Sequence, residues 1–262
     1  MADASEGTPI WADAMFPDLE GAKAFYGEVL GWTFGESSPE YGGYTRAFAD
    51  GKAVAAVVPP APGQEGPSRW CLYLASPDAA ATAGRIRENG GTVLLEPTQV
   101  GELGTMCLAR DPGGVFFGVW QGGTYKGFEA TNVPGSFCWA EVVTREPGKA
   151  DAFFPAVFGY GVKALVDPEG DFKVFDLGRG PVLGRMETTD DSPPEVPSYV
   201  QVYWTVADCD AAVAAVRRRG GRLVFGPMTT PFGRFAAVVD PQGAPFAVID
   251  TATTEGEMPS FT

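Results

Sequence analysis

The sequence predicts an α+β protein made of four βαβββ units, arranged as two tandem halves. Three observations lead to this prediction: an internal repeat, short amphipathic helix patterns that each follow a strand pattern, and strand pairs joined by Asp-Pro turns. The chain has 262 residues, of which 45% are hydrophobic, so it can bury a sizeable core. At about 100–200 residues per domain, this length fits two small halves or one large unit.

The internal repeat defines the domain organisation. Trp11-Ala12-Asp13 recurs 128 residues later as Trp139-Ala140-Glu141, and the offset stays between 128 and 130 residues along a whole half. Further matching pairs are Gly31 and Gly159, Gly90-Gly91 and Gly220-Gly221, and Asp111-Pro112 and Asp240-Pro241. An offset this constant indicates a tandem duplication. The predicted parts are a first half at 8–121, a linker at 122–134, a second half at 135–252 and a loose tail at 253–262.

The first unit begins with a strand pattern at 10–16, and Asp18 suits the N-cap of the helix that follows. Apolar residues then recur at helical spacing and form one stripe. They are Ala22, Phe25, Tyr26, Val29 and Leu30. Gly31 is placed to end this helix, and strand patterns follow at 44–49 and 53–58 before a Pro/Gly-rich connection.

The second unit repeats this order of elements. A strand pattern at 70–74 precedes Asp78, a second N-cap, and a helix pattern at 79–89. Gly90-Gly91 ends that helix. The remaining strand patterns lie at 92–95, 105–109 and 115–120, the last two joined by the turn Asp111-Pro112-Gly113-Gly114. Because the second half carries the same signals, the chain holds four such units.

Charge, hydropathy and cysteine content exclude several classes of partner. The net charge is −14, whereas nucleic-acid binding needs a positive surface. The dense basic cluster, Arg217-Arg218-Arg219 with Arg222, ends a helix pattern, where cations complement the helix dipole. No apolar run reaches the ~18 residues of a membrane span, and the acidic N-terminus lacks a signal-peptide pattern. We expect a cytoplasmic protein with buried free thiols, bound to neither nucleic acid nor membrane.

The sequence contains no histidine. This excludes an imidazole general base, an imidazole-ligated metal and a Ser-His-Asp or Cys-His nucleophile. No nicotinamide or flavin fingerprint is present either. The sequence therefore predicts a protein without a cofactor.

Two motifs of the first half resemble those of a known superfamily. They are Asp18-Leu19-x-x-Ala22-x-x-Phe25-Tyr26-x-x-Val29-Leu30-Gly31-Trp32 and Asp111-Pro112-x-Gly114, and the second half repeats them more loosely. They resemble the vicinal oxygen chelate superfamily of glyoxalase I, bleomycin resistance proteins and extradiol dioxygenases. The resemblance covers residues 9–250 and is strongest to a tandem bacterial branch often labelled hydroxylases, some of them from antibiotic biosynthesis. It implies two glyoxalase-like halves that form an intrachain pseudo-dimer, and hence a monomeric chain.

The resemblance also implies where a divalent metal would bind, and this sequence departs from that pattern. The implied ligand positions fall at Trp11 and Trp139, at Leu72 and Val202, at Gly118 and Ala247, and near Ala55 or Ala56 and Gly184. None of these side chains can hold Zn, Ni or Fe. The sequence therefore predicts no metal site.

Aromatic residues surround these implied metal positions. Residues of one parity on a strand share a face, which places several rings on the cavity side, beside Gly118 and Ala247. These two small residues are expected to leave volume there. The predicted ligand-binding residues are Trp11, Trp70, Leu72, Phe116, Gly118, Trp120, Trp139, Val202, Trp204 and Ala247. They favour a flat, apolar ligand; the alternative is that they simply form the core.

Asp13 and Glu141 each lie two residues beyond a tryptophan on an opening strand, so each is expected near a cavity. Either carboxylate could serve as a general base and is a candidate catalytic residue. The alternative is structural, by capping backbone amides or pairing with Arg46 or Arg185. Tyr41, Tyr44 and Tyr125 are candidates to supply further hydroxyl groups to the cavity.

Two classes of function remain open. The protein could be a metal-independent binding protein that sequesters or presents a planar aromatic natural product or biosynthetic intermediate. Alternatively, it could be a cofactor-independent tailoring enzyme on an aromatic polyketide-type substrate. The first class needs only an aromatic cavity, whereas the second also needs a carboxylate with a shifted pKa beside the ligand.

Overall fold

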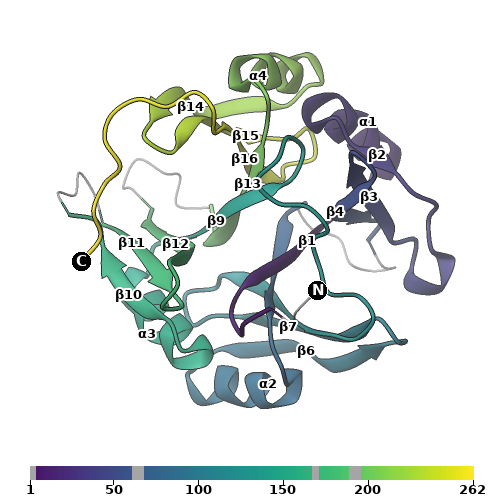
Figure 1. Ribbon diagram of the computed structural model, residues 1–262. Coiled ribbons are helices and arrows are strands. Elements are labelled where there is room, and N and C mark those ends of the chain that lie inside the picture. Colours follow the sequence, from purple (N-terminus) through teal and green to yellow (C-terminus); the bar gives the residue numbers. More distant parts are fainter. Residues whose placement is uncertain (1–3, 61–67, 167–170, 189–195) are drawn as a thin grey trace.

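The computed structural model describes residues 4–60, 68–166, 171–188 and 196–262. Within these residues the chain forms two mixed sheets of eight strands each, one per half, together with four α-helices (Figure 1). None of the described helices combines the length and the apolar character that a membrane span needs. The predicted α+β class with two tandem halves is confirmed.

The first half contains the elements up to the linker. They are β1 (Pro9–Met15), α1 (Leu19–Leu30), β2 (Thr33–Phe34), a 3₁₀ turn (Pro39–Tyr41), β3 (Thr45–Ala49), β4 (Lys52–Val58), β5 (Trp70–Ala75), α2 (Ala79–Glu88), β6 (Thr92–Val100), β7 (Gly104–Arg110) and β8 (Phe116–Gly122). The strand order is β2-β3-β4-β1-β5-β8-β7-β6. The two units therefore join through β1 and β5, which pair antiparallel at the centre of the sheet.

The second half repeats this topology. Its elements are β9 (Phe137–Thr144), α3 (Pro147–Phe158), β10 (Gly161–Ala164), β11 (Phe172–Asp176), β12 (Pro181–Glu187), β13 (Tyr199–Thr205), α4 (Cys209–Arg218), β14 (Arg222–Thr230), β15 (Gly233–Val239) and β16 (Pro245–Asp250). The strand order β10-β11-β12-β9-β13-β16-β15-β14 matches that of the first sheet element by element.

Local sequence explains the helix positions. The Asp18 carboxylate accepts a hydrogen bond of 2.9 Å from the Gly21 N–H, which caps α1. Gly31 ends the helix with a φ of 71°, a left-handed conformation that favours glycine. All five residues of the predicted apolar stripe are buried. The connection predicted after β4 lies largely outside the described residues, since 61–67 are among those not described.

The largest core lies between the two halves. Trp70 of β5 and Trp204 of β13 meet there with ring centroids 5.0 Å apart, and Leu72 and Val202 are buried in the same cluster. Trp70 Nε1–H donates to the Tyr26 hydroxyl at 3.2 Å. The expected cavity-side placement of these four residues of β5 and β13 is therefore wrong.

The register of the sheet gives the physical reason for this correction. Asp13 of β1 lies opposite Cys71 of β5, and Trp11 lies opposite Tyr73. Residues directly opposite one another in an antiparallel pair point to the same face. The odd-numbered residues of β5 therefore face the cavity. The prediction from the sequence placed the even-numbered residues Trp70 and Leu72 there, and an error of one residue in the register exchanges the two faces of a strand.

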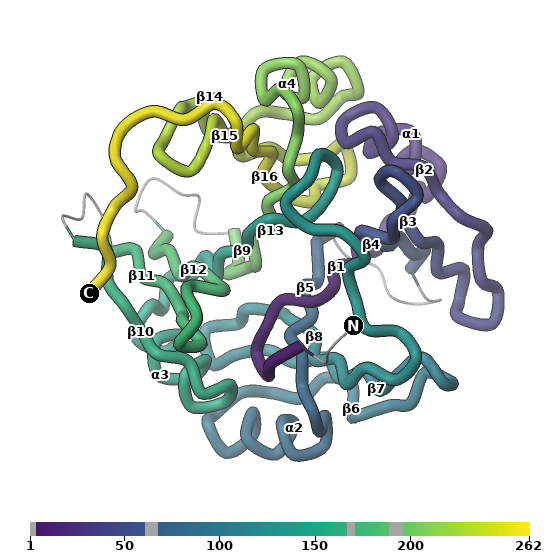
Figure 2. The backbone as a smooth tube through the Cα atoms, viewed as in Figure 1, coloured from purple at the N-terminus to yellow at the C-terminus, as the bar shows by residue number. Residues whose placement is uncertain are grey.

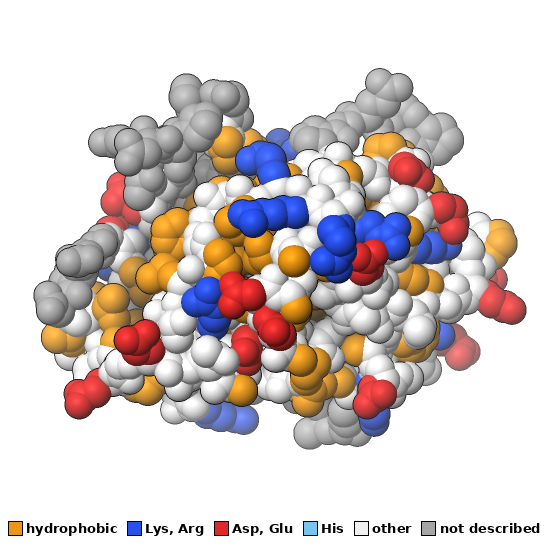
Figure 3. All heavy atoms as spheres, turned by 90° about the horizontal axis from the view of Figure 1, so that it is seen from above, with side chains coloured by type: hydrophobic (Ala, Val, Ile, Leu, Met, Phe, Trp, Pro, Cys, Tyr) orange, Lys and Arg blue, Asp and Glu red, His pale blue; other side chains and the backbone are white. Residues whose placement is uncertain are grey.

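The arginine cluster at the end of α4 joins the two halves. Arg218 Nη2 lies 3.1 Å from Glu28 Oε1 of α1, and Arg219 also pairs with Glu28. Figure 3 views the molecule from the α4 side of Figure 1 and shows basic and acidic side chains interspersed there. These contacts support the structural interpretation of the cluster.

The C-terminal tail returns to the edge of the second sheet. It runs from β16 to β10 (Figure 2), where Ala164 and Thr262 exchange backbone hydrogen bonds of 2.7 and 3.0 Å. Phe261 forms an isolated bridge with Leu165. The tail predicted to be loose at 253–262 is therefore paired at its end.

We predict that the chain is a monomer in solution. The duplication places the pseudo-dimer contact inside one chain, where α1 packs on α4 and α2 packs on α3. Light scattering at micromolar concentration should give the chain mass of 27.6 kDa. A mass of about twice this value, persisting on dilution, would contradict the prediction.

Candidate functional site

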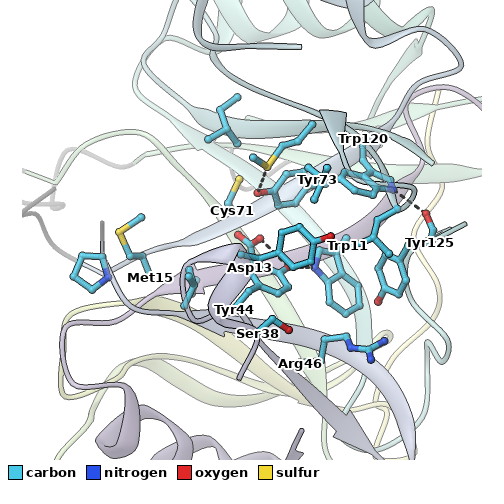
Figure 4. A pocket seen from close by; sticks show the side chains of 18 of the residues that line it. Trp11, Asp13, Met15, Ser38, Tyr44, Arg46, Cys71, Tyr73, Trp120 and Tyr125 are labelled. Atoms are coloured by element: carbon cyan, nitrogen blue, oxygen red, sulfur yellow. Dashed lines mark hydrogen bonds between the residues drawn. The ribbon is translucent and has the colours of Figure 1, made fainter. Parts of the chain in front are cut away.

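The first sheet encloses a cavity of about 920 Å³ on the face that points away from the core between the halves (Figure 4). Residues of β1 and of β3 to β8 line it, together with Tyr125 of the predicted linker. Small-molecule sites have volumes of roughly 300–1,000 Å³. The cavity is therefore large enough for a ligand of several fused rings.

The sheet register places two rows of side chains, each running across neighbouring strands, on the cavity face. The first row is polar and the second is mainly aromatic. Asp13 lies opposite Cys71 in the first row. In the second row, Trp11 lies opposite Tyr73, which lies beside Gly118 of β8. Strands lie about 4.8 Å apart, so these side chains form one continuous surface. Cys71 and Tyr73 were missed by sequence reasoning because their facing depends on the β1–β5 register.

A short chain of hydrogen bonds ends on Asp13. Trp11 Nε1–H donates to the Tyr44 hydroxyl at 2.6 Å, and that hydroxyl donates to Asp13 Oδ2 at 3.1 Å (Figure 4). Burial raises the pKa of Asp13 to about 7, although hydrogen bonding to Tyr44 and Tyr73 lowers it in part. A carboxyl group with this pKa can either accept or donate a proton near neutral pH.

The alternative in which Asp13 pairs with Arg46 is not what the structure shows. Tyr44 supplies the hydrogen bond to this carboxylate, and Arg46 lies instead with its guanidinium carbon 5.6 Å from the centre of the Phe48 ring. Arg185, the other suggested partner, pairs with Asp151. Asp13 therefore has hydroxyl neighbours but no cationic one among the described residues.

Aromatic side chains form one end of the cavity. Trp11 meets Tyr125 edge to face with ring centroids 5.2 Å apart, and Trp120 Nε1–H donates to the Tyr125 carbonyl at 3.0 Å. The buried Tyr125 hydroxyl has no hydrogen-bond partner within the described part of the chain. Phe116 also lines the cavity. The indole N–H of Trp120 thus has an acceptor, whereas the Tyr125 hydroxyl has no partner among the described residues. Tyr41 and Tyr44 line the cavity as well.

Gly118 has a role that differs from the expected one. A Cβ at this position would lie 2.2 Å from Cδ1 of Tyr73, so the Tyr73 ring fills the space above the glycine. The expectation that Gly118 leaves free volume is therefore wrong. In the second half, Ala247 is the residue beside Tyr203 on the neighbouring strand, as Gly118 is beside Tyr73.

We predict that Gly118→Ala lowers the free energy of unfolding by about 1–3 kcal/mol, because the Tyr73 ring must move in a packed sheet. Urea unfolding of the purified protein measures this change. Gly84→Ala is a matched control, since a Cβ at Gly84 in α2 meets nothing within 4 Å and should stabilise the helix by about 0.5–1 kcal/mol. Equal stability of Gly118→Ala and wild type would contradict the role given to Tyr73.

Glu141, the second-half counterpart of Asp13, already has hydrogen-bond partners within the protein. Trp139 Nε1–H donates to Glu141 Oε1 at 3.2 Å, and the Tyr203 hydroxyl donates to Oε2 at 2.8 Å. Burial raises the pKa of Glu141. Because both oxygens of Glu141 are used within the protein, the first-half cavity around Asp13 is the better candidate site.

Comparisons with known proteins agree with this architecture. Residues 11–119 match the model of the Glyoxalase/Bleomycin resistance protein/Dioxygenase superfamily. The anthracycline biosynthesis protein DnrV of Streptomyces peucetius is 38% identical over 93% of each chain. The chain belongs to this superfamily. A glyoxylase candidate of Mycobacterium tuberculosis is 36% identical over 94% of this chain and 96% of its own.

Solved structures show the same fold at low sequence identity. The Mn(II)-bound glyoxalase from Novosphingobium aromaticivorans is 18% identical, with a TM-score of 0.64, over 97% of this chain and 87% of its own. The 2,3-dioxygenase LapB of a Pseudomonas species is 14% identical, with a TM-score of 0.65, over 98% and 95%. These likenesses extend the shared fold over both halves of the chain.

The cavity does not offer the ligand set that a divalent metal requires in this superfamily. Trp11 and Gly118 stand at two of the implied ligand positions, and Leu72, at a third, points into the core. Asp13 and Cys71 face the cavity, but burial raises the pKa of the Cys71 thiol well above its usual range. No group of three acidic, cysteine or histidine side chains suited to a metal occurs among the described residues.

Proposed function

We propose that the protein binds a planar aromatic small molecule in the first-half cavity, without a metal. The observation that carries this proposal is the cavity itself, of about 920 Å³, whose lining combines indole and phenol rings with aliphatic side chains. Flat ligands stack favourably on such rings. The name of the relative DnrV supports a natural product or a biosynthetic intermediate as the ligand, held for sequestration, resistance or presentation.

In this proposal the rings lie against Trp120 and Phe116, while the polar edge of the ligand meets Asp13 and the Tyr125 hydroxyl. Trp11 has its N–H engaged with Tyr44, so it contributes a ring edge and orients Tyr44. Trp139 and Ala247 belong to the second sheet and take no part in this site.

Binding is tested by isothermal titration calorimetry with a panel of anthraquinones. We expect Trp120→Ala to weaken binding about tenfold, because a stacking ring and its buried area contribute roughly 1–3 kcal/mol. Trp139→Ala is the matched control, since this indole lies on the equivalent face of the second sheet, and it should leave affinity unchanged. Absence of binding across the panel would reject the proposal.

One observation favours a second candidate function, a cofactor-independent tailoring enzyme. The pKa of Asp13 is raised to about 7, which suits a general base at neutral pH. Asp13→Asn separates the two functions because it keeps the shape of the carboxylate but removes its basicity. A binding protein should retain affinity for the anthraquinone, whereas an enzyme should lose turnover while it still binds substrate.

A further inference from the structure

Three arginines line the first-half cavity, and none of them has a carboxylate partner among the described residues. Arg46 of β3, Arg69 just before β5 and Arg110 at the end of β7 all contribute to its wall, and none forms an ion pair with a residue that the structure describes. Six arginines elsewhere in the described chain pair with carboxylates. They are Arg85, Arg87, Arg185, Arg218, Arg219 and Arg234.

Arg69 and Arg110 belong to neighbouring parts of one cavity wall. Arg69 directly precedes β5, β5 pairs with β8, and Arg110 lies opposite Phe116 of β8. Partial burial lowers the pKa of the Arg69 guanidinium, and the charge of Arg110 lowers it further. Two like charges on one cavity wall repel one another, and an anion bound between them would relieve this repulsion. In a protein with a net charge of −14, many carboxylates were available to neutralise them, and none does so among the described residues.

The acidic residues of the cavity do not cancel this charge. Burial raises the pKa of Asp13, hydrogen bonds with Tyr44 and Tyr73 lower it in part, and no arginine of the described residues forms an ion pair with this carboxylate. Glu36 is exposed at the rim and forms no ion pair with a described residue. The arginines therefore form a local positive site within a strongly acidic molecule, which would otherwise repel an anion.

We propose that the ligand of this cavity is an aromatic acid, whose anionic substituent, a carboxylate in the simplest case, lies between Arg69 and Arg110. This inference rests on the proposed function and narrows its ligand class. Guanidinium groups bind carboxylates through paired, charge-assisted hydrogen bonds. Arg110 lies opposite Phe116 in the β7–β8 pair, so a ligand held by its acid group there would place its rings against Phe116 and Trp120.

The test compares two planar probes of similar size and shape, the anion anthraquinone-2-carboxylate and the neutral anthraquinone-2-carboxamide, by calorimetry with the full chain. We expect the carboxylate to bind about tenfold more tightly than the carboxamide at low ionic strength, and the preference to shrink in high salt because salt screens exposed charges. The double variant Arg69→Gln/Arg110→Gln should lose the preference while it keeps its affinity for the carboxamide. The matched control Arg217→Gln/Arg222→Gln removes the same charge from exposed positions of the second half and should keep the preference.

Each outcome decides between the inference and the proposal on which it rests. Equal affinity of wild type for the two probes would overturn the aromatic acid and leave aromatic binding intact. A preference that survives in the Arg69→Gln/Arg110→Gln variant would show that these arginines do not hold the acid group. If neither probe binds, both the proposed function and the inference are rejected.

Discussion

Trp204→Ala is expected to lower the free energy of unfolding by about 3–5 kcal/mol, the usual cost of truncating a large buried aromatic side chain. The Trp204 side chain is 0% exposed. Its ring meets those of Trp70 and Trp32 with centroids 5.0 Å away in each case. The substitution leaves a void between the halves that surrounding strands cannot close, and urea unfolding monitored by circular dichroism measures the loss.

A second variant separates lost packing from a lost hydrogen bond. Trp204 Nε1 is buried and has no partner within the described residues, so Trp204→Phe should cost much less than Trp204→Ala. Trp70→Phe, in contrast, removes the hydrogen bond to Tyr26 and should add about 1 kcal/mol to the packing loss. If Trp204→Ala weakened aromatic binding without loss of stability, Trp204 would belong to the ligand site and its placement in the core would be wrong.

Asp13→Asn is expected to make the protein more stable than wild type at pH 8 but not at pH 4. The folded protein holds the Asp13 proton until about pH 7, whereas the ordinary pKa of this carboxyl group is 3.8. Between these values the folded state binds more protons than the unfolded state, so stability falls as the pH rises. The proton on Asp13 thus stabilises the folded state fully below pH ~4, and this contribution is lost by pH ~7. The free energy of unfolding changes by on the order of 4 kcal/mol over this range. An asparagine cannot ionise and avoids this loss.

Urea unfolding of wild type and Asp13→Asn across this pH range tests the prediction. Glu141, whose pKa is also raised by burial, is present in both proteins, so its contribution cancels in the difference. Asp50→Asn, at an exposed turn position outside the cavity, is the control for the same exchange elsewhere in the chain. Parallel stability curves for wild type and Asp13→Asn would show that Asp13 ionises normally in the folded protein.

Local sequence signals were sufficient for the elements of the fold. The carboxylates of Asp18 and Asp78 cap α1 and α2 as predicted, because a cap depends on residues only three positions apart. The duplication could also be predicted from the sequence, because equivalent residues of the two halves recur at a nearly constant offset. Part of the cavity wall also followed from strand parity alone, as Trp11 and Asp13 share a face of β1 and Phe116 and Trp120 share a face of β8.

Features that depend on pairing between distant strands could not be predicted in this way. Whether β5 turns Trp70 or Cys71 towards the cavity is set by its register with β1, because one residue of slip reverses every side chain. The space above Gly118 is filled from a neighbouring strand, by Tyr73.

The sequence by itself determined the element order, the two halves and the absence of histidine chemistry, because these depend on composition and on residues close along the chain. The tertiary structure alone decided that Trp70 and Trp204 pack between the halves and that Arg69 and Arg110 line one cavity. The physical reason is that burial and the distances between charges depend on contacts across the sheets. The separation of two residues along the chain does not determine their distance in the folded protein.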